Sequence, residues 1–266
     1  MRSRALNRLA NRVIAGLGAA AAHRQLAYDP SDTALLLVGP QPDLLPCADT
    51  VAALTRLVTT VRAAGLLAIY VPAARPAPRD QISFPTPSQR ATVEDGLLRP
   101  GSTGAGIHPE LAPRDGDLVL APHPRLSAFA QTGLATRLSD RGVRRIVLAG
   151  ARTDIEVDST ARDGIELGLQ TTVVADCCTG TSPENHRTTV SITLPRIVHG
   201  VLELNEITRQ LSPHSSKTDN AGMPARTRTS GQRHAQRSLF QAHDASLAAA
   251  RPAPRRGRPS STGPPR

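Results

Sequence analysis

Glu156 occupies a position where a carboxylate could take part in chemistry. The apolar run Ile146–Ala149 is typical of a strand buried on both faces of a parallel sheet, and Gly150 ends it. A helix is expected to begin at about Ile155. Ligands of open α/β sheets bind beyond the carboxyl ends of the strands, so we expect Gly150–Glu156 to line a pocket. A carboxylate there can act as a nucleophile or base, although the N-terminus of the helix stabilises the anion and lowers its basicity.

The rest of the sequence alternates between short apolar runs and amphipathic stretches. This pattern predicts an α/β fold with a doubly wound, six-stranded parallel sheet flanked by helices. Strands are expected at Thr33–Gly39, Leu66–Val71, Asp117–Ala121, Ile146–Ala149, Thr171–Ala175 and His199–Leu204, and helices at Cys47–Ala64, within Leu126–Arg141, from Ile155 to Leu167, after Ser182 and around Asn205–Leu211. The long Pro-, Gly- and Ser-rich connection Pro72–Pro113 is expected to be a functional lid or partly disordered.

The segment around Glu156 resembles the isochorismatase-like family, which includes cysteine amidases such as nicotinamidase and N-carbamoylsarcosine amidase. In that family the segment reads Gly, two or three small residues, Thr, two residues, Cys-Val and then Thr-Ala-x-Asp-Ala. This chain has Gly150-Ala-Arg-Thr153-Asp-Ile-Glu156-Val157-Asp-Ser-Thr160-Ala161-Arg-Asp163-Gly164. A second segment, Gly101–Pro113, is similar to the family's Gly-rich loop before His-Pro-Glu-Leu. The resemblance covers residues 28–211 and implies the same α/β fold.

The resemblance also implies three catalytic positions, and each has changed in this chain. Gly39 replaces the general acid–base Asp, His123 replaces the Lys, and Glu156 replaces the nucleophilic Cys. Glycine has no proton to exchange. Histidine can titrate near neutrality, but it is shorter than lysine and its positive charge is not fixed. Asp43, which the family also has, is expected to cap the turn into the next helix.

Some features of the family's site would survive these changes. The family has a non-proline cis peptide bond before the nucleophile, which by position is Ala151–Arg152 here. The resemblance further implies an oxyanion hole made by the backbone N–H groups of Arg152 and Glu156. Arg125, two residues after His123, could supply the missing positive charge.

Three hypotheses about function follow, and the third is that the basic tail makes the protein a nucleic-acid-associated adaptor. The first is a catalytically degenerate member of the family, without amide or vinyl-ether hydrolysis, that acts by binding a small-molecule ligand or by assembly. The second is an active hydrolase of a small molecule in which Glu156 and His123 form a new acid–base pair. The family resemblance implies a homo-oligomer, and we expect no cofactor and no metal.

The net charge of +10 is concentrated at one end of the chain. Residues 212–266 contain 10 Lys and Arg against 2 Asp and Glu, so residues 1–211 carry only +2. This Arg-, Pro- and Ser-rich tail has too few apolar residues to offset its ordering entropy, and we expect it to be disordered. Residues 1–27 are expected to form a helical N-terminal extension; they also resemble a signal peptide, but nothing downstream looks secreted. Residues 28–211 form the predicted α/β domain.

Composition excludes several classes of partner. Only 2% of the residues are aromatic, so base stacking is absent and nucleic-acid binding by the tail would be non-specific and salt-sensitive. The longest apolar run is too short to cross a membrane. Cys47, Cys177 and Cys178 have no spacing typical of a disulfide framework or a zinc site. Cys177 and Cys178 are expected to be structurally buried. We therefore expect a cytoplasmic protein with no membrane contact and no specific nucleic-acid partner.

Overall fold

The computed structural model describes residues 26, 28–77 and 82–211. The helical extension expected over residues 1–27 and the tail expected over residues 212–266 lie outside the described residues, apart from Leu26. Within the described part of the chain, no helix has the length and apolar character needed to cross a membrane.

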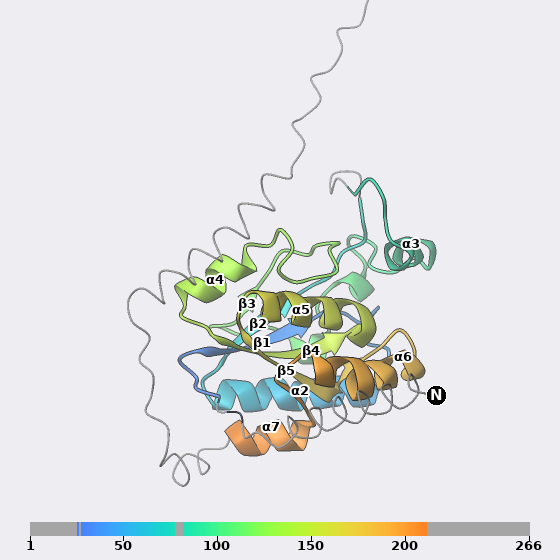
Figure 1. The fold of residues 1–266 in the computed structure, drawn as a ribbon. Helices are drawn as coiled ribbons and strands as arrows, with labels where there is room; N and C mark the ends of the chain where they lie inside the picture. The colour runs from blue at the N-terminus through green and yellow to red at the C-terminus, as the bar shows by residue number, and fades with distance from the viewer. Residues whose placement is uncertain (1–25, 27, 78–81, 212–266) are drawn as a thin grey trace, which may run out of the picture.

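Six parallel strands form a single sheet in the order β3-β2-β1-β4-β5-β6 (Figure 1). The strands are β1 (Thr33–Val38), β2 (Leu67–Val71), β3 (Leu118–Val119), β4 (Arg145–Ala151), β5 (Gln170–Thr179) and β6 (Gly200–Leu202). The chain winds outward from β1 to β3 and then outward in the opposite direction from β4 to β6. The predicted doubly wound sheet is therefore confirmed, and the topological switch point lies between β1 and β4.

Helices cover both faces of the sheet. They are α2 (Ala48–Ala63), α4 (Leu134–Asp140), α5 (Asp158–Glu166), α6 (Pro183–Thr188) and α7 (Leu204–Leu211). Figure 1 shows α2 and α7 together on one face, with α4 and α5 on the other. Two short turns, η5 (Thr189–Thr193) and η6 (Leu194–Arg196), connect α6 to β6.

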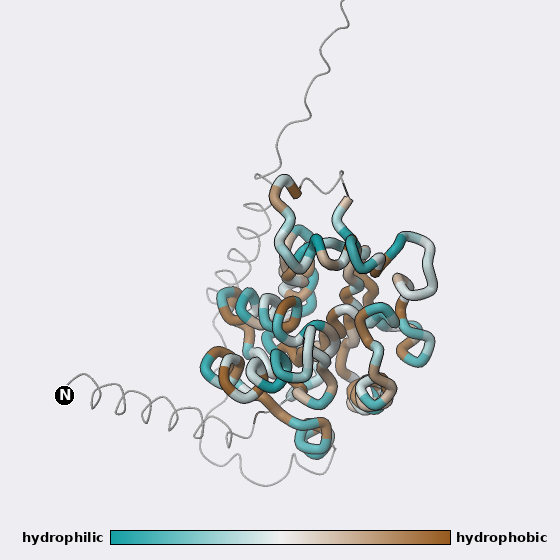
Figure 2. The backbone as a smooth tube through the Cα atoms, turned by 90° about the vertical axis from the view of Figure 1, so that its right-hand side faces the viewer, coloured by the Kyte–Doolittle hydropathy of each residue, from teal (hydrophilic) through white to brown (hydrophobic). Residues whose placement is uncertain are grey.

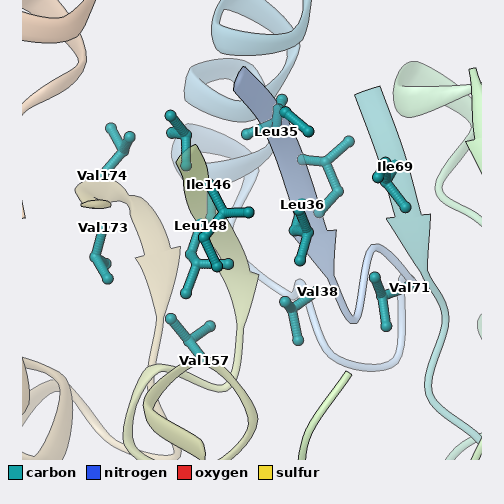
Figure 3. Packing of buried hydrophobic residues seen from close by; sticks show 14 of the residues in the cluster. Leu35, Leu36, Val38, Ile69, Val71, Ile146, Leu148, Val157, Val173 and Val174 are labelled. Atoms are coloured by element: carbon teal, nitrogen blue, oxygen red, sulfur yellow. The ribbon is translucent and has the colours of Figure 1, made fainter. Parts of the chain in front are cut away.

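The core consists of the central strands and the helix faces that cover them. All six residues of β1 are buried, as expected for a strand covered on both faces. Figure 3 shows Leu36, Leu148 and Val173 on neighbouring strands, with Val157 packing beneath them from the start of the next helical segment. In Figure 2 the apolar segments gather in the interior and the hydrophilic segments lie toward the outside. Each fully buried Leu or Val side chain contributes about 1.5–3 kcal/mol to folding.

Several elements differ in length from those predicted. β3 contains only Leu118 and Val119, because it pairs with β2 alone at the edge of the sheet. β5 continues to Thr179 and so includes both neighbouring cysteines. In the stretch where a helix was predicted within Leu126–Arg141, α4 begins only at Leu134, after Gly133 with φ +69°.

The connection Pro72–Pro113 contains a helix that the sequence analysis missed. This helix, α3 (Pro87–Glu94), is followed by two short turns, η2 (Thr103–Ala105) and η3 (Pro109–Leu111). The Thr86 hydroxyl accepts a hydrogen bond from the Gln89 backbone N–H, and the Gln89 side chain binds the Thr86 N–H in return. Such a capping box, with Pro87 at the first helical position, is a recognised signal for a helix start.

Candidate functional site

The carboxyl ends of β1 and β4 meet at the switch point, where the segment 150–157 begins. Gly150 lies opposite Val38 with φ +122°, and a Cβ atom at Gly150 would lie 2.0 Å from the Val38 carbonyl oxygen. The peptide bond Ala151–Arg152 is cis, as expected from the family resemblance. The chain then enters a π-helical turn, η4 (Thr153–Val157), before α5 begins. The predicted helix therefore starts with a wider turn, a feature that is frequent at functional sites.

Glu156, in this turn, is bound by Arg152 one turn earlier. Arg152 Nε donates to Glu156 Oε2 at 2.9 Å, and Arg152 Nη2 forms an ion pair with Oε1. The Arg152 backbone N–H also points at Oε2, at 3.4 Å. The two side chains are only 14% and 7% exposed, so the pair is largely removed from water. The N–H of Arg152 that was expected to face a ligand thus faces the protein's own carboxylate.

The turn is fixed from its other side by α6 and by the connection between β5 and α6. The Thr153 hydroxyl lies 2.9 Å from His186 Nδ1, and the Asp154 carboxylate accepts hydrogen bonds from the backbone and hydroxyl of Thr181. Burial lowers the pKa of His186. These contacts hold Thr153 and Asp154 in place, so Arg152 and Glu156 emerge from a rigid backbone.

His123 follows β3, on the side of the sheet where the carboxyl ends of the strands lie. Its Nδ1 accepts a hydrogen bond of 3.3 Å from the Arg125 backbone N–H, which places the ring proton on Nε2. Nε2 is buried and has no hydrogen-bond partner among the described residues. Burial, with the Arg125 charge as a second cause, lowers the His123 pKa to about 4. His123 is therefore neutral at pH 7 and supplies no fixed positive charge at the position of the family's Lys.

The Arg125 side chain does not supply the free positive charge that was expected of it. Its Nη2 donates to Gln131 Oε1 at 2.8 Å, and its charge disfavours protonation of His123. Arg125 is thus already engaged, whereas Arg152 supplies the positive charge beside Glu156.

Gly39 directly follows β1 and has φ +57°, in the left-handed region that favours glycine. A Cβ atom there would lie 2.8 Å from the Ala151 carbonyl oxygen and 3.0 Å from Leu44 Cδ1. The backbone at this position is therefore fitted to glycine, and an aspartate could be introduced only with a local shift.

The helix α3 reaches both sides of the site. The Gln89 side chain donates to the Pro124 carbonyl at 2.8 Å, next to His123, and Arg152 Nη1 lies 3.4 Å from the Thr92 hydroxyl. Thr92 and Gln89 were not among the candidate residues, although the capping box that places them was visible in the sequence. Within the described residues 82–113 of the expected lid, α3 therefore makes direct contacts to Arg152 and Pro124.

Gln41 and Asp43, which follow β1 in the chain, bind the connection Pro72–Pro113 through their side chains. The buried Gln41 side chain donates to the carbonyls of Ala73 and Ala105 and accepts from the Ala73 N–H. Asp43 accepts a hydrogen bond of 2.6 Å from the Leu98 N–H. Asp43 was expected to cap the turn into the following helix, but its carboxylate binds the more distant Leu98, and the N-cap of α2 is Cys47, without a side-chain cap. The Leu98 that it binds is a non-glycine residue with a positive φ of 53°.

We expect His123 to make stability fall as the pH falls. The folded-state pKa of about 4 lies below the ordinary histidine pKa of 6.5, so the unfolded chain binds the proton more readily. The contribution of His123 to the free energy of unfolding is then fully present above about pH 6.5. It is lost progressively as the pH falls to about 4, and the total loss is about 3 kcal/mol. Urea unfolding of the wild type and of His123→Gln between pH 7.5 and 4 measures this. Equal losses in both proteins would contradict the expectation.

The three cysteines differ sharply in environment. Burial raises the pKa of Cys178 to about 12 and raises that of Cys177 as well, whereas Cys47 is exposed and the backbone N–H and hydroxyl of Thr50 lower its pKa. Cys177 and Cys178 lie within β5, in agreement with the expected structural burial.

We therefore expect a thiol reagent at pH 7.5 to label Cys47 of the native protein and to leave the two buried thiols unreacted until the protein unfolds. Mass spectrometry after brief alkylation, with and without denaturant, tests this. A Cys47→Ser variant that still takes up one label in its native state would contradict it.

Comparisons with known proteins agree with this geometry. The model of the isochorismatase domain matches residues 33–196, more than half of the chain. The chain belongs to the isochorismatase family. Among solved structures, this isochorismatase-family chain is similar to an isochorismatase family protein from Burkholderia thailandensis, with 24% identity over 70% of this chain and 97% of the other and a TM-score of 0.57.

Two further structures share the fold. A cysteine hydrolase from Pseudomonas syringae pv. phaseolicola is 21% identical over 70% of this chain and 95% of its own, with a TM-score of 0.60. N-carbamoylsarcosine amidase from Thermoplasma acidophilum is 22% identical over 65% and 95%, with a TM-score of 0.52. At these identities the likeness establishes the isochorismatase-family fold, and function has to be argued from the site.

Proposed function

We propose that this chain keeps the isochorismatase fold without the family's amide or vinyl-ether hydrolysis, and acts by binding a small molecule or by assembly. By resemblance, Gly39, His123 and Glu156 occupy the positions of the family's Asp, Lys and Cys. A glycine, a neutral imidazole and a paired carboxylate provide neither the general base, nor the fixed cation, nor the thiolate of that chemistry.

The observation that carries the proposal is the state of Glu156. Both of its oxygens are bound by Arg152, and the side chain is almost fully buried. A carboxylate that serves as a nucleophile or base needs a free oxygen directed at the substrate. Breaking the pair to free one would leave a buried guanidinium and a buried carboxylate without partners, which is costly.

The alternative function is a hydrolase in which Glu156 and His123 act as an acid–base pair. One observation favours it: His123 Nε2 is buried and has no hydrogen-bond partner in the part of the chain that the structure describes, so a ligand atom could bind there. However, Nδ1 already accepts a hydrogen bond and Nε2 carries the proton, so neither nitrogen is positioned as a base. The neutral ring is better suited to donating a hydrogen bond to a ligand than to exchanging protons.

We expect the purified protein to hydrolyse nicotinamide, N-carbamoylsarcosine and isochorismate no faster than the background rate. Groups that act together in catalysis have non-additive effects, so loss of all three leaves only the contribution of binding. Product formation is measured by chromatography, with Glu156→Gln as the test variant and Glu166→Gln, an exposed carboxylate at the end of α5, as the control. Turnover that disappears in Glu156→Gln and persists in Glu166→Gln would establish the alternative.

We also propose that the protein is a cytoplasmic homo-oligomer, as the family resemblance implies. Sedimentation equilibrium of the full chain at micromolar concentration gives the molar mass directly. A mass equal to the 28.1 kDa of one chain at all concentrations would exclude assembly.

A further inference from the structure

We propose that Arg152 forms a binding site for a small carboxylate, and that Glu156 is the internal ligand that occupies this site in the native protein. This goes beyond the proposed function, because it concerns which anion the site accepts and does not depend on whether any substrate is hydrolysed.

The contacts are those of a carboxylate receptor. Arg152 presents Nε and Nη2 to the two oxygens of Glu156, the paired arrangement in which a guanidinium recognises a carboxylate. Its backbone N–H adds a third donor to Oε2 at 3.4 Å. The Thr92 hydroxyl, 3.4 Å from Nη1, supports the far side of the guanidinium from α3. All three donors to the carboxylate come from one residue, Arg152, which directly precedes the π-helical turn that carries Glu156.

The charge balance shows why the site requires an anion. Among the described residues, Glu156 is the only carboxylate that forms an ion pair with Arg152. The Arg152 side chain is largely buried, so removal of its partner leaves a desolvated cation. An anion from solution that reaches the guanidinium would restore the pairing.

Glu156 closes the site to external anions by competition. It lies four residues from Arg152 on the same turn, so its effective concentration at the guanidinium is at least in the millimolar range. An external carboxylate must displace it to bind. Truncation to alanine removes Cγ and the carboxylate, which together have the same heavy atoms as an acetate ion, and so leaves space for that ligand.

The test is thermal unfolding of the full-length Glu156→Ala protein in sodium acetate and sodium formate, compared with sodium chloride at equal ionic strength. We expect the variant to be destabilised in chloride. Carboxylate at about 100 times its Kd is expected to raise the unfolding midpoint by roughly 5–10 °C. The wild type, whose site is filled, is expected to show no difference between acetate and chloride.

The double variant Arg152→Ala, Glu156→Ala is the matched control, because it lacks both the ligand and the receptor. It is expected to respond equally to acetate and chloride. If Glu156→Ala does not fold in chloride, the yield of refolded protein in acetate relative to chloride replaces the midpoint. Equal behaviour of Glu156→Ala in acetate and chloride, by midpoint or by yield, would overturn the proposal. An acetate effect of the same size in the double variant would overturn it as well.

Discussion

Gly150→Ala is expected to destabilise the protein by about 4 kcal/mol or more, a loss that few single substitutions reach. The added methyl group would lie 2.0 Å from the Val38 carbonyl oxygen, at a φ of +122° that L-residues rarely adopt. Neither atom can move freely, because Val38 and Gly150 are partners in the two central strands of the sheet. Strand β1 or β4 must shift, and the backbone of the site shifts with it.

Gly168→Ala provides the matched control for this prediction. Gly168 also has a positive φ, of +75°, but a Cβ atom there meets nothing within 4 Å. Its substitution should therefore cost only the conformational penalty of a left-handed residue, about 1–2 kcal/mol. Urea unfolding monitored by circular dichroism compares the two variants with the wild type. If both substitutions cost the same, the close approach of β1 and β4 at Gly150 is not a determinant of stability.

The sheet could be predicted because each central strand corresponds to a short apolar run that is recognisable in the sequence without its neighbours. The run that became β1 is continuously apolar, and such a run bounded by a glycine has few alternatives to a buried parallel strand. Edge elements carry weaker signals. β3 has a partner on one side only, and its Val119 is 45% exposed, so sequence pattern alone overestimates its length.

The motif assigns Glu156 and His123 to positions of the family's site, but it does not give their electrostatic states. A pair of opposite charges four residues apart, such as Arg152 and Glu156, is in most helices a weak surface pair. Here the π-helical turn and the packing of α3 remove it from water. The pKa of His123 depends likewise on burial beside residues distant in sequence, which no local pattern records.

Arg152→Ala is expected to destabilise the protein by about 3–5 kcal/mol, because it leaves the buried Glu156 carboxylate without its partner. Glu156→Ala leaves the complementary buried cation and is expected to have a comparable cost. The double variant removes both charges, so its cost should be well below the sum of the two. The resulting coupling free energy in a double-mutant cycle is expected to be about 2–4 kcal/mol.

The pair Asp158 and Arg162 on α5 is the matched control for this cycle. It has the same spacing of four residues and an Nε to Oδ2 distance of 2.8 Å, but its Arg side chain is 49% exposed, against 14% for Arg152. Its coupling free energy is expected to be only about 0.3–0.5 kcal/mol. Both cycles are measured by urea unfolding in chloride buffer at one pH. Equal coupling in the two pairs would mean that Arg152 and Glu156 behave as a solvated surface pair, and that Glu156 is free to take part in chemistry.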